Sequence, residues 1–419
     1  MKSITLSKMD RSLHGVIPLP ASKSISNRLL IIQELCGKPF GISNLSEADD
    51  TLLLSGLLRE MEHVKPGKQV LSLDTANAGT VMRFLTALLS SRPGRWMLTG
   101  SDRMKQRPVG GLVDALISLG AVIDYLGKPG YPPLLVKGTT LKGGTVAIDA
   151  GVSSQFISAL LMIAPGIPGG LTIKLKGDVV SSPYLKMTID LMEHFGIRIK
   201  SQQNQIRVHP GAYQPKPFTV PADWSAAAFW YEAVAFSARG DLELPGLVPG
   251  ALQGDAVLAE IYRNFGVHTE FSASGARLTR EPVKIDGFYF DFTDYPDIAQ
   301  AVIATCVGLG IRGRFEGLKS LQIKETDRLR AIKSEIEKLG FECNITARGE
   351  ALAAMEISPS RHKTIAQPVF ETFGDHRMAM SLAPFAMQLG SVRIQNPDVV
   401  VKSYPRFWEH LKMTGFQII

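Results

Sequence analysis

LVDALISLGAVIDYL, at residues 112–126, has the pattern of an amphipathic helix that ends at Gly120 and continues at once into a strand. A helix commonly stops at a residue in the left-handed conformation, which glycine adopts without Cβ strain. The same succession recurs in TIDLMEHFGIRIKS (188–201), LAEIYRNFGVHTEF (258–271), AIKSEIEKLGFECNI (331–345) and, in degenerate form, WEHLKMTGFQII (408–419). The glycines of these copies lie about 70 to 76 residues apart, and this nearly fixed period indicates internal duplication. The helix TLLLSGLLREMEHV (51–64) can end a sixth copy without its glycine.

A second set of helices is apolar on too many sides to lie on a surface, so we expect these helices in the core. They begin with small polar residues, and they are PASKSISNRLLIIQEL (20–35), NAGTVMRFLTALLSS (77–91), SSQFISALLMIAP (153–165), ADWSAAAFWYEAVAF (222–236), YPDIAQAVIATCVG (295–308) and GDHRMAMSLAPFAM (374–387). Short β-rich stretches such as GGTVAIDA (143–150) and SVRIQN (391–396) alternate with the helices. The alternation predicts a mixed α/β fold.

The composition is that of a globular protein with more than one core. The chain has 419 residues, of which 45% are hydrophobic, and this length favours two domains. The net charge is +7, and the basic residues are dispersed. A nucleic-acid-binding protein would concentrate them in a stripe, whereas small anionic substrates need only a few well-placed cations. The dispersed pattern therefore favours small anionic substrates.

The cysteines and the hydropathy pattern indicate a cytoplasmic enzyme without a metal. Cys36, Cys306 and Cys343 form no CxxC pair, so we expect reduced, buried thiols and no zinc site. The opening stretch MKSITLSKMDRSLHG lacks the apolar core of a signal peptide. No uninterrupted apolar run approaches the roughly 20 residues that span a bilayer. We expect a soluble, intracellular protein.

Seven stretches place small polar residues at or just before a helix start, often beside a cation. A helix N-terminus presents unpaired N–H groups and a partial positive charge, which makes it an anion site. These stretches are residues 20–28, 74–83, 103–108, 153–155, 181–184, 324–328 and 374–380. If several of these ends meet at one place, they form a receptor for phosphates and carboxylates.

The same stretches resemble motifs of the 5-enolpyruvylshikimate-3-phosphate (EPSP) synthase family, and they occur in the family's order. The motifs are PASKSISNR (20–28), DTANAGTVMR (74–83), LTGSDRMKQRPVGGLVDAL (98–116), GVSSQFISALLM (151–162), YPDIA (295–299), IKETDRL (323–329) and GDHRMAMS (374–381). With Lys402 they extend over nearly the whole chain. One such motif would be weak, but seven in register are highly specific.

The resemblance implies the architecture of the enolpyruvyl transferase family. That fold has two lobes, each built from three copies of a βαβαββ unit, which accounts for the period of about 70 residues. It implies one lobe at residues 20–221 and a second at residues 1–19 and 222–419. It also implies an active site in the cleft between the lobes, and a hinge near the proline-rich stretch HPGAYQPKPFTVPADW (209–224).

The resemblance also assigns roles to individual residues. For shikimate 3-phosphate it implies contacts from Lys23, Ser24, Arg28, Ser153, Ser154, Gln155, Ser181, Tyr184, Asp297 and Lys324. For phosphoenolpyruvate (PEP) it implies contacts from Lys23, Asn77, Gly79, Arg107, Gln155, Arg328, Arg377 and Lys402. The catalytic residues that it implies are Asp297, Glu325, Lys23 and His376.

These residue types suit the reaction that the resemblance implies. The 5-hydroxyl of shikimate 3-phosphate loses a proton, C3 of PEP gains one, and a tetrahedral adduct then expels phosphate. Two carboxylates and a lysine can carry those protons, while fixed cations stabilise the charge on the departing phosphate. We expect no cofactor and no metal. We also expect no nucleic-acid or membrane partner, and a monomer.

The sequence departs from the family pattern at Phe84, where many relatives have proline. Proline in the first turns of a helix removes an N–H and crowds the carbonyl four residues back, which here belongs to Thr80. Phenylalanine should therefore give a more regular helix start and shift Gly79 slightly. The hypothesis is that the herbicide glyphosate, which occupies the PEP pocket in this family, binds less well. ADWSAAAF also departs from the family's usual helix start, which puts a role for Asp223 in doubt.

Three other functions remain open at this stage. The enolpyruvyl transferase that acts on UDP-N-acetylglucosamine shares the fold and the donor, but it usually carries a reactive cysteine in the loop that here reads LTGSDRMKQRPVGG. An RNA-binding or RNA-end-processing protein of related architecture would need a basic stripe and an aromatic stacking series. An inactive relative is disfavoured, because the charged residues of the implied site are retained.

Overall fold

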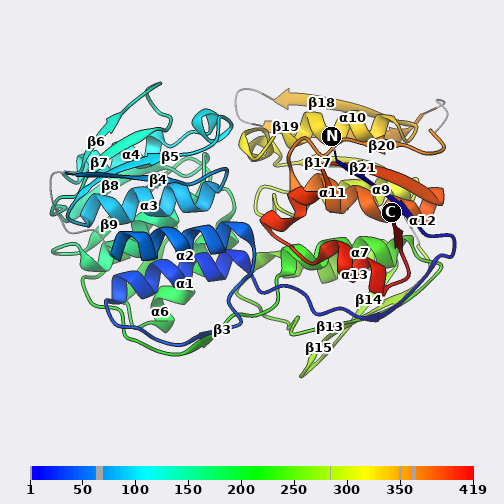
Figure 1. The fold of residues 1–419 in the computed structure, drawn as a ribbon, viewed down its shortest axis with the longest axis horizontal. Coiled ribbons are helices and arrows are strands. Elements are labelled where there is room, and N and C mark those ends of the chain that lie inside the picture. Colours follow the sequence, from blue (N-terminus) through cyan, green and yellow to red (C-terminus); the bar gives the residue numbers. More distant parts are fainter. Residues whose placement is uncertain (1, 63–68, 284, 349–351, 361–364) are drawn as a thin grey trace. The chain divides into compact units, whose positions relative to one another are not determined.

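The computed structural model describes residues 2–62, 69–283, 285–348, 352–360 and 365–419 (Figure 1). The chain forms two compact units. Unit 1 comprises Met1–Ser22, Glu47–Asp49 and Pro221–Ile419, and unit 2 comprises Lys23–Ser46 and Asp50–Val220. Unit 1 is therefore discontinuous in sequence.

One sheet pattern recurs in both units, as the internal period predicts. In unit 2, β4 (Val70–Asp74) pairs parallel with β5 (Arg95–Thr99), β5 pairs antiparallel with β7 (Leu134–Lys137), and β7 pairs antiparallel with β6 (Val122–Tyr125). The second such sheet of unit 2 has the order β10-β11-β9-β8 and consists of β8 (Gly144–Asp149), β9 (Leu171–Lys176), β10 (Ile199–Gln202) and β11 (Gln205–Val208).

Unit 1 contains three sheets with this pattern. The first is β14-β15-β13-β2, from β2 (Ser12–Val16), β13 (Arg239–Pro245), β14 (Val267–Ser272) and β15 (Gly275–Arg280). The second is β16-β17-β19-β18, from β16 (Gly287–Asp291), β17 (Arg312–Glu316), β18 (Phe341–Arg348) and β19 (Leu352–Pro359). The third is β20-β21-β1-β22, from β1 (Ser3–Ser7), β20 (Val369–Phe370), β21 (Ser391–Gln395) and β22 (Gln417–Ile418).

The two N-terminal strands explain why unit 1 is discontinuous. β1 pairs antiparallel with β21, so the first strand of the chain completes the last sheet. β2 pairs parallel with β13, which lies more than 200 residues later. Unit 2 is thus inserted into a single strand-to-helix connection of unit 1.

The sixth copy is reduced. Its sheet contains, among the described residues, only β3 (Ile42–Ser43) and β12 (Phe218–Thr219), which pair parallel. Its second helix is α2 (Asp49–Glu62), and β4 of the next copy begins at Val70. The fold is confirmed as mixed α/β with three repeat copies in each unit, one of them shortened.

The repeated glycines have the conformation that the sequence predicts. They follow α4 (Gly110–Ser118), α6 (Ser182–His194), α8 (Leu258–Arg263), α10 (Arg328–Glu337) and α13 (Phe407–Met413). Their φ angles are +94° for Gly120, +88° for Gly196, +72° for Gly266, +75° for Gly340 and +88° for Gly415. Each glycine therefore ends a helix in a conformation that other residues rarely adopt.

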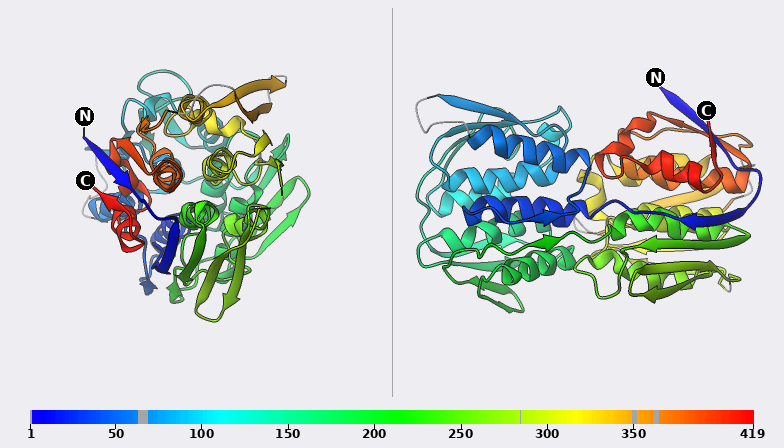
Figure 2. Two further views of the ribbon diagram at one scale, coloured as in Figure 1. Left: turned by 90° about the vertical axis from the view of Figure 1, so that its right-hand side faces the viewer. Right: turned by 60° about the horizontal axis from the view of Figure 1, so that its bottom comes forward.

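The apolar helices form the interior of each unit. In unit 2, α1 (Lys23–Cys36), α3 (Gly79–Ser91) and α5 (Ser154–Ile163) pack on one another. In unit 1 the same is true of α7 (Trp224–Phe236), α9 (Ala299–Gly308) and α11 (His376–Leu382), which is followed by α12 (Ala386–Leu389). Every residue of α7 is buried. The left view of Figure 2 looks nearly along the helices of unit 1 and shows strands around them.

Candidate functional site

The predicted residues of unit 2 lie at the first turns of its core helices. Lys23 is the first residue of α1, and its Nζ lies 3.0 Å from Oδ2 of Asp50 in α2 (Asp49–Glu62). Both side chains are largely buried, with 17% and 8% exposed. The carboxylate holds the ammonium group in one place. Local sequence patterns do not reveal this pair, because its members come from different helices.

Arg28, one turn further along α1, is buried among α1, α5 and α6. Its Nε donates to Oγ1 of Thr188 at 2.7 Å, and its Nη1 donates to the carbonyl of Ser24 at 2.9 Å. Its Nη2 donates to Oγ of Ser158 and to the carbonyl of Tyr184, both at 3.3 Å. Within the described residues no carboxylate pairs with Arg28. Burial lowers the pKa of Arg28 to about 10, so the group stays cationic at neutral pH.

The serines of the fourth and fifth stretches lie at helix starts. Ser153 is the N-cap of α5, and its Oγ accepts from the N–H of Gln155 at 3.3 Å. The Nε2 of Gln155 donates to Oγ1 of Thr80 in α3 at 3.2 Å, which joins the starts of α3 and α5. Ser154 is buried. Ser181 precedes α6 with a φ of +57°, an unusual conformation for serine that the surrounding structure has to maintain.

Two guanidinium groups converge on Gly79, the first residue of α3. A Cβ at this position would lie 2.5 Å from Nη2 of Arg107 and 2.8 Å from Nη1 of Arg83, so any other residue would have to displace these guanidinium groups. Nη1 of Arg107 donates to the carbonyl of Asn77 at 3.1 Å, and Nη2 of Arg83 donates to that of Pro108 at 2.7 Å. Two buried cations beside a helix N-terminus favour an anionic ligand.

The predicted residues of unit 1 meet around Arg328, the first residue of α10. Its Nε lies 2.6 Å from Oδ2 of Asp375, its Nη2 lies 2.8 Å from Oε2 of Glu325, and its Nη1 lies 3.3 Å from Oδ1 of Asp297. Only 2% of the Arg328 side chain is exposed. Burial alone would lower the pKa of Arg328, but attraction to the three carboxylates raises it above its ordinary value.

Asp297 is the centre of this unit 1 cluster. Besides Arg328, its carboxylate lies 3.5 Å from Nζ of Lys324 and 3.3 Å from Nη2 of Arg377. Nη1 of Arg377 also donates to the backbone carbonyl of Asp297 at 2.5 Å. Because Asp297 precedes α9 and Arg377 lies in α11, these contacts bring two helix starts together.

Two further predicted residues lie in or next to α11, which carries Arg377 of this cluster. His376 is buried at the start of α11, with its Nδ1 3.6 Å from Oδ1 of Asp375. Lys402 ends the 3₁₀ helix η6 (Pro397–Lys402), which packs against α11.

A second carboxyl group lies at the start of α7. Asp223 caps this helix, and its Oδ1 accepts from the N–H of Ser225 at 2.8 Å and from Nε2 of Gln253 at 2.8 Å. Ser225 in turn donates to Asp255, which is fully buried. Burial, followed by the negative charge of Asp297, raises the pKa of Asp255 to about 7. The role of Asp223 that the sequence left in doubt is therefore that of a helix cap.

Sequence reasoning missed several residues of these clusters. Asp375 was quoted within GDHRMAM without a role, although an aspartate before a helix start is a recognisable capping signal, and here it also holds Arg328. Asp50, Asp255, Ser158 and Thr188 had no local signal, because their partners are distant in sequence.

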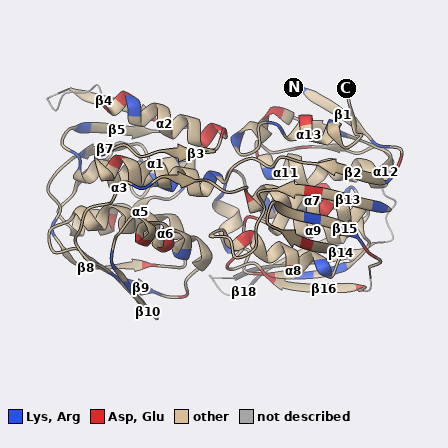
Figure 3. Cartoon of the chain, turned by 90° about the horizontal axis from the view of Figure 1, so that it is seen from below, with Lys and Arg blue, Asp and Glu red and all other residues tan. Residues whose placement is uncertain are grey.

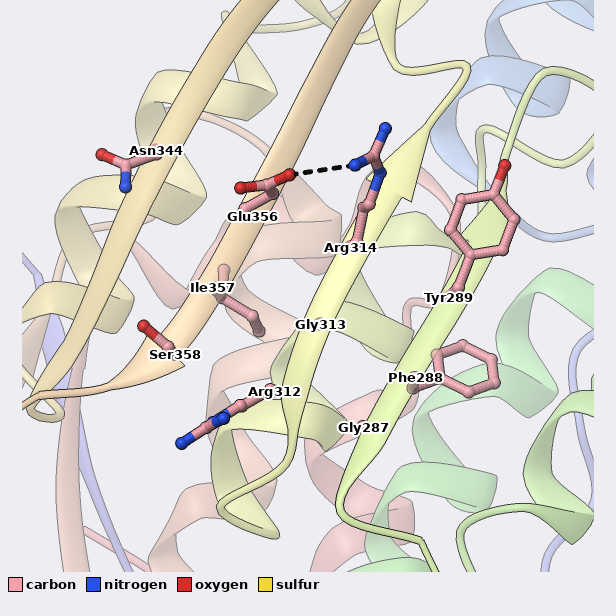
Figure 4. Close-up of a pocket in the computed structure, with 10 residues that line it drawn as sticks. All are labelled: Gly287, Phe288, Tyr289, Arg312, Gly313, Arg314, Asn344, Glu356, Ile357 and Ser358. Carbon is pink, nitrogen blue, oxygen red and sulfur yellow. Dashed lines mark hydrogen bonds and ion pairs between the residues drawn. The ribbon is translucent and has the colours of Figure 1, made fainter.

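The hollow drawn in Figure 4 lies elsewhere. It has a volume of about 460 Å³ and lies on the polar face of the β16-β17-β19-β18 sheet, between Gly287, Arg312, Asn344 and Ser358. Arg314 and Glu356 pair across it at 3.4 Å. None of the predicted residues lines this hollow. The hollow is therefore separate from the predicted site residues.

Among the described residues, no three His, Cys, Asp or Glu side chains group so that they could hold a metal ion. None of the described helices is both long enough and apolar enough to cross a membrane.

Comparisons with known proteins give a consistent result. The family model described as EPSP synthase (3-phosphoshikimate 1-carboxyvinyltransferase) matches residues 8–411. The 3-phosphoshikimate 1-carboxyvinyltransferase of Bacteroides fragilis is 44% identical over 97% of this chain and 96% of its own length. The protein of the same name from Sulfurovum sp. is 35% identical over 98% of this chain and 99% of its own length. The solved EPSP synthase of Acinetobacter baumannii has the same fold, with a TM-score of 0.77 at 22% identity over all of both chains.

Proposed function

Because the chain belongs to the EPSP synthase (3-phosphoshikimate 1-carboxyvinyltransferase) family, we propose roles in that reaction for the residues described above. The protein is an enzyme of the shikimate pathway of aromatic amino-acid biosynthesis. It transfers the enolpyruvyl group of PEP to the 5-hydroxyl of shikimate 3-phosphate and releases phosphate. The match over residues 8–411 carries this assignment.

Shikimate 3-phosphate is bound by the helix starts of unit 2, together with residues of unit 1. Lys23, Ser24 and Arg28 come from α1, Ser153, Ser154 and Gln155 from the start of α5, and Ser181 and Tyr184 from the start of α6. Asp297 and Lys324 contribute from unit 1. The buried, cationic Arg28, which has only neutral acceptors among the described residues, supports this role, because a buried cation gains most from an anionic ligand.

PEP is bound by cations from both units. In unit 2 these are Lys23 and Arg107, with Asn77, Gly79 and Gln155 beside them, and in unit 1 they are Arg328, Arg377 and Lys402. Arg107 and Arg83 at Gly79 support an anion site at this position. Fixed cations also stabilise the charge that develops on the phosphate as it leaves.

Asp297 and Glu325 carry the protons, with Lys23 as the third proton-carrying group and His376 beside the carboxylates. The two carboxylates approach the same guanidinium, that of Arg328, which fixes both of them within one small region. One carboxylate can accept the proton of the 5-hydroxyl while another acid protonates C3 of PEP. Loss of that proton from the adduct then accompanies the departure of phosphate.

The remaining features follow the family. The substrates bind in the cleft between the lobes at residues 20–221 and at residues 1–19 and 222–419, and anion binding draws the lobes together. The enzyme is a cytoplasmic monomer that needs no cofactor or metal and has no nucleic-acid or membrane partner. Figure 3 shows basic and acidic residues interspersed along the elements of both units, which disfavours an RNA-binding role. The comparisons do not favour the UDP-N-acetylglucosamine enzyme.

Phosphate release tests the proposal. The purified protein is incubated with PEP, with shikimate 3-phosphate and with both, and inorganic phosphate is measured over time. We expect release only when both substrates are present. Release from PEP with UDP-N-acetylglucosamine in place of shikimate 3-phosphate would contradict the assignment.

A further inference from the structure

The guanidinium group of Arg28 is held from several directions. Hydrogen bonds from Nε, Nη1 and Nη2 reach Thr188, Ser24, Ser158 and Tyr184, and they fix the edges of the group. A guanidinium group has five N–H donors, and these bonds account for four of them. The remaining donor is on Nη1, which has one acceptor, the carbonyl of Ser24, among the described residues.

Hydrogen bonds in the plane of a guanidinium group restrain its tilting out of that plane less than its movement within it. The ring of Phe84, in α3, lies with its centroid 5.5 Å from Cζ of Arg28. Phe84 is 1% exposed and Arg28 is 3% exposed, so water screens this contact little. A cation near an aromatic face is attracted to it, and the attraction grows when both groups are desolvated.

The side chain of Phe84 thus contacts a residue that the sequence did not connect with it. The sequence connected position 84 to Gly79 and to the PEP pocket through the regularity of the helix. In the structure the side chain of Phe84 reaches Arg28 in α1, a residue assigned to the other substrate. Proline, which many relatives have at this position, has no aromatic face to offer.

We propose that Phe84 is a positioning residue, whose ring holds the Arg28 guanidinium so that the remaining N–H of Nη1 donates to shikimate 3-phosphate. This inference rests on the proposed function, because it takes Arg28 as a ligand of that substrate. It makes the identity of residue 84 a determinant of affinity for the acceptor substrate rather than for PEP.

The first test is steady-state kinetics of Phe84→Leu, which keeps most of the volume and removes the aromatic face. We expect the KM for shikimate 3-phosphate to rise about 3- to 30-fold, the range of a desolvated cation–π contact, while the KM for PEP changes less than about twofold. Phe195→Leu is the matched control. Phe195 is equally buried in unit 2, but its aromatic neighbours are Phe40, His194 and Phe218. The control should leave both KM values unchanged.

The second test is a double-mutant cycle with Arg28→Met, followed by urea unfolding, which needs no substrate. Phe84→Leu should lower the folding equilibrium constant about 3- to 30-fold more when Arg28 is present than in the Arg28→Met background. Phe84→Met serves in the same cycle if the leucine variant does not fold. This measurement tests the interaction between Phe84 and Arg28 even if the wild type releases no phosphate. An absence of phosphate release would contradict the proposed function but not this interaction.

Three results would overturn the inference. The first is that the two substitutions have additive effects on unfolding. The second is that Phe84→Leu leaves the KM for shikimate 3-phosphate unchanged while Arg28→Met raises it. The third is that Phe84→Leu raises only the KM for PEP. The last result would show that position 84 acts through Gly79.

Discussion

Arg28 in unit 2 and Arg328 in unit 1 are both buried near the start of a helix, but their surroundings are opposite. Arg28 donates to hydroxyl and carbonyl oxygens, and burial lowers its pKa. Arg328 meets the three carboxylates of Asp375, Glu325 and Asp297, and its pKa is raised.

The different partners of the two arginines suit two different roles, substrate binding and proton transfer. Neutral acceptors fix the orientation of Arg28 and leave its charge uncompensated, which suits a binding site for an anionic substrate. The carboxylates around Arg328 balance its charge and are themselves fixed by it, which suits groups that exchange protons. In the proposed mechanism, unit 2 mainly recognises the acceptor substrate, and unit 1 mainly carries the proton transfers.

The largest expected effect follows from removing Glu325, the proposed proton carrier in unit 1. Glu325→Gln keeps the size of the side chain and an oxygen that can accept from Nη2 of Arg328, but it removes the titratable group. We expect kcat to fall by about two to four orders of magnitude, the usual range for an acid/base group, with a much smaller change in substrate binding. Single-turnover phosphate release measures this effect. Near-normal turnover would show that Glu325 carries no proton.

The second prediction compares the two arginines directly by stability. Arg328→Met leaves Asp375, which is fully buried, without its main cation, and this should cost about 3 to 5 kcal/mol of unfolding free energy. Arg28→Met leaves no acid behind. The hydroxyls of Thr188 and Ser158 still bond each other at 2.9 Å, so the loss should stay below about 2 kcal/mol.

Urea unfolding followed by tryptophan fluorescence measures both variants. Equal losses would mean that the neutral acceptors of Arg28 depend on its charge as strongly as the carboxylates of Arg328 do. The proposed division of tasks between the units would then fail.

The sequence predicted the parts of the molecule that are encoded locally. Gly120, Gly196 and the three later glycines were recognised from a helix followed by a strand, and each of them has a positive φ. The polar helix starts were recognised in the same way, because capping residues and cations lie within one turn of the helix that they serve.

Contacts between distant segments were not predictable from local patterns. Asp50 pairs with Lys23 because α2 meets the start of α1, and Phe84 packs on Arg28 because helices from different copies meet in the core. Arg28 alone has the pattern of a solvated arginine on the first turns of a helix, and its burial depends on α5 and α6, more than 120 residues later. The resemblance named Arg28 as a ligand, but it offered no account of what holds it.

The third prediction concerns the protonation of Asp255, which lies next to the unit 1 cluster. The pKa of Asp255 is about 7 in the folded protein, whereas its ordinary value is 3.8. Between about pH 4 and pH 7 the carboxyl group is therefore protonated in the folded state and ionised in the unfolded state. The wild type should therefore lose stability as the pH rises through this window, by roughly 1.4 kcal/mol per pH unit. Asp255→Asn has no proton to lose.

The stability of Asp255→Asn relative to the wild type should thus increase by about 2 kcal/mol between pH 5 and pH 6.5. Asp241→Asn is the control, because a bond from Arg277 lowers the pKa of this exposed carboxyl, and that variant should show no such gain. Parallel pH profiles for the wild type and Asp255→Asn would show that Asp255 is already ionised in the folded state.

The smallest effect is expected from Ser158→Ala, which removes one neutral acceptor of Arg28 and leaves the Cβ in place. Nη2 keeps the carbonyl of Tyr184 at 3.3 Å, and Thr188 keeps both its bond from Nε and its own bond to that carbonyl at 2.9 Å. The loss should be about 1 kcal/mol, the net value of one hydrogen bond, measured as a lower urea midpoint with an unchanged denaturant slope. The matching substitution in unit 1, Asp375→Ala, removes a charged partner of Arg328 and the cap of α11, so it should cost at least twice as much. A similar loss of unfolding free energy in the two alanine variants would show that one hydroxyl holds Arg28 as strongly as one carboxylate holds Arg328. The contrast between the two sites would then disappear.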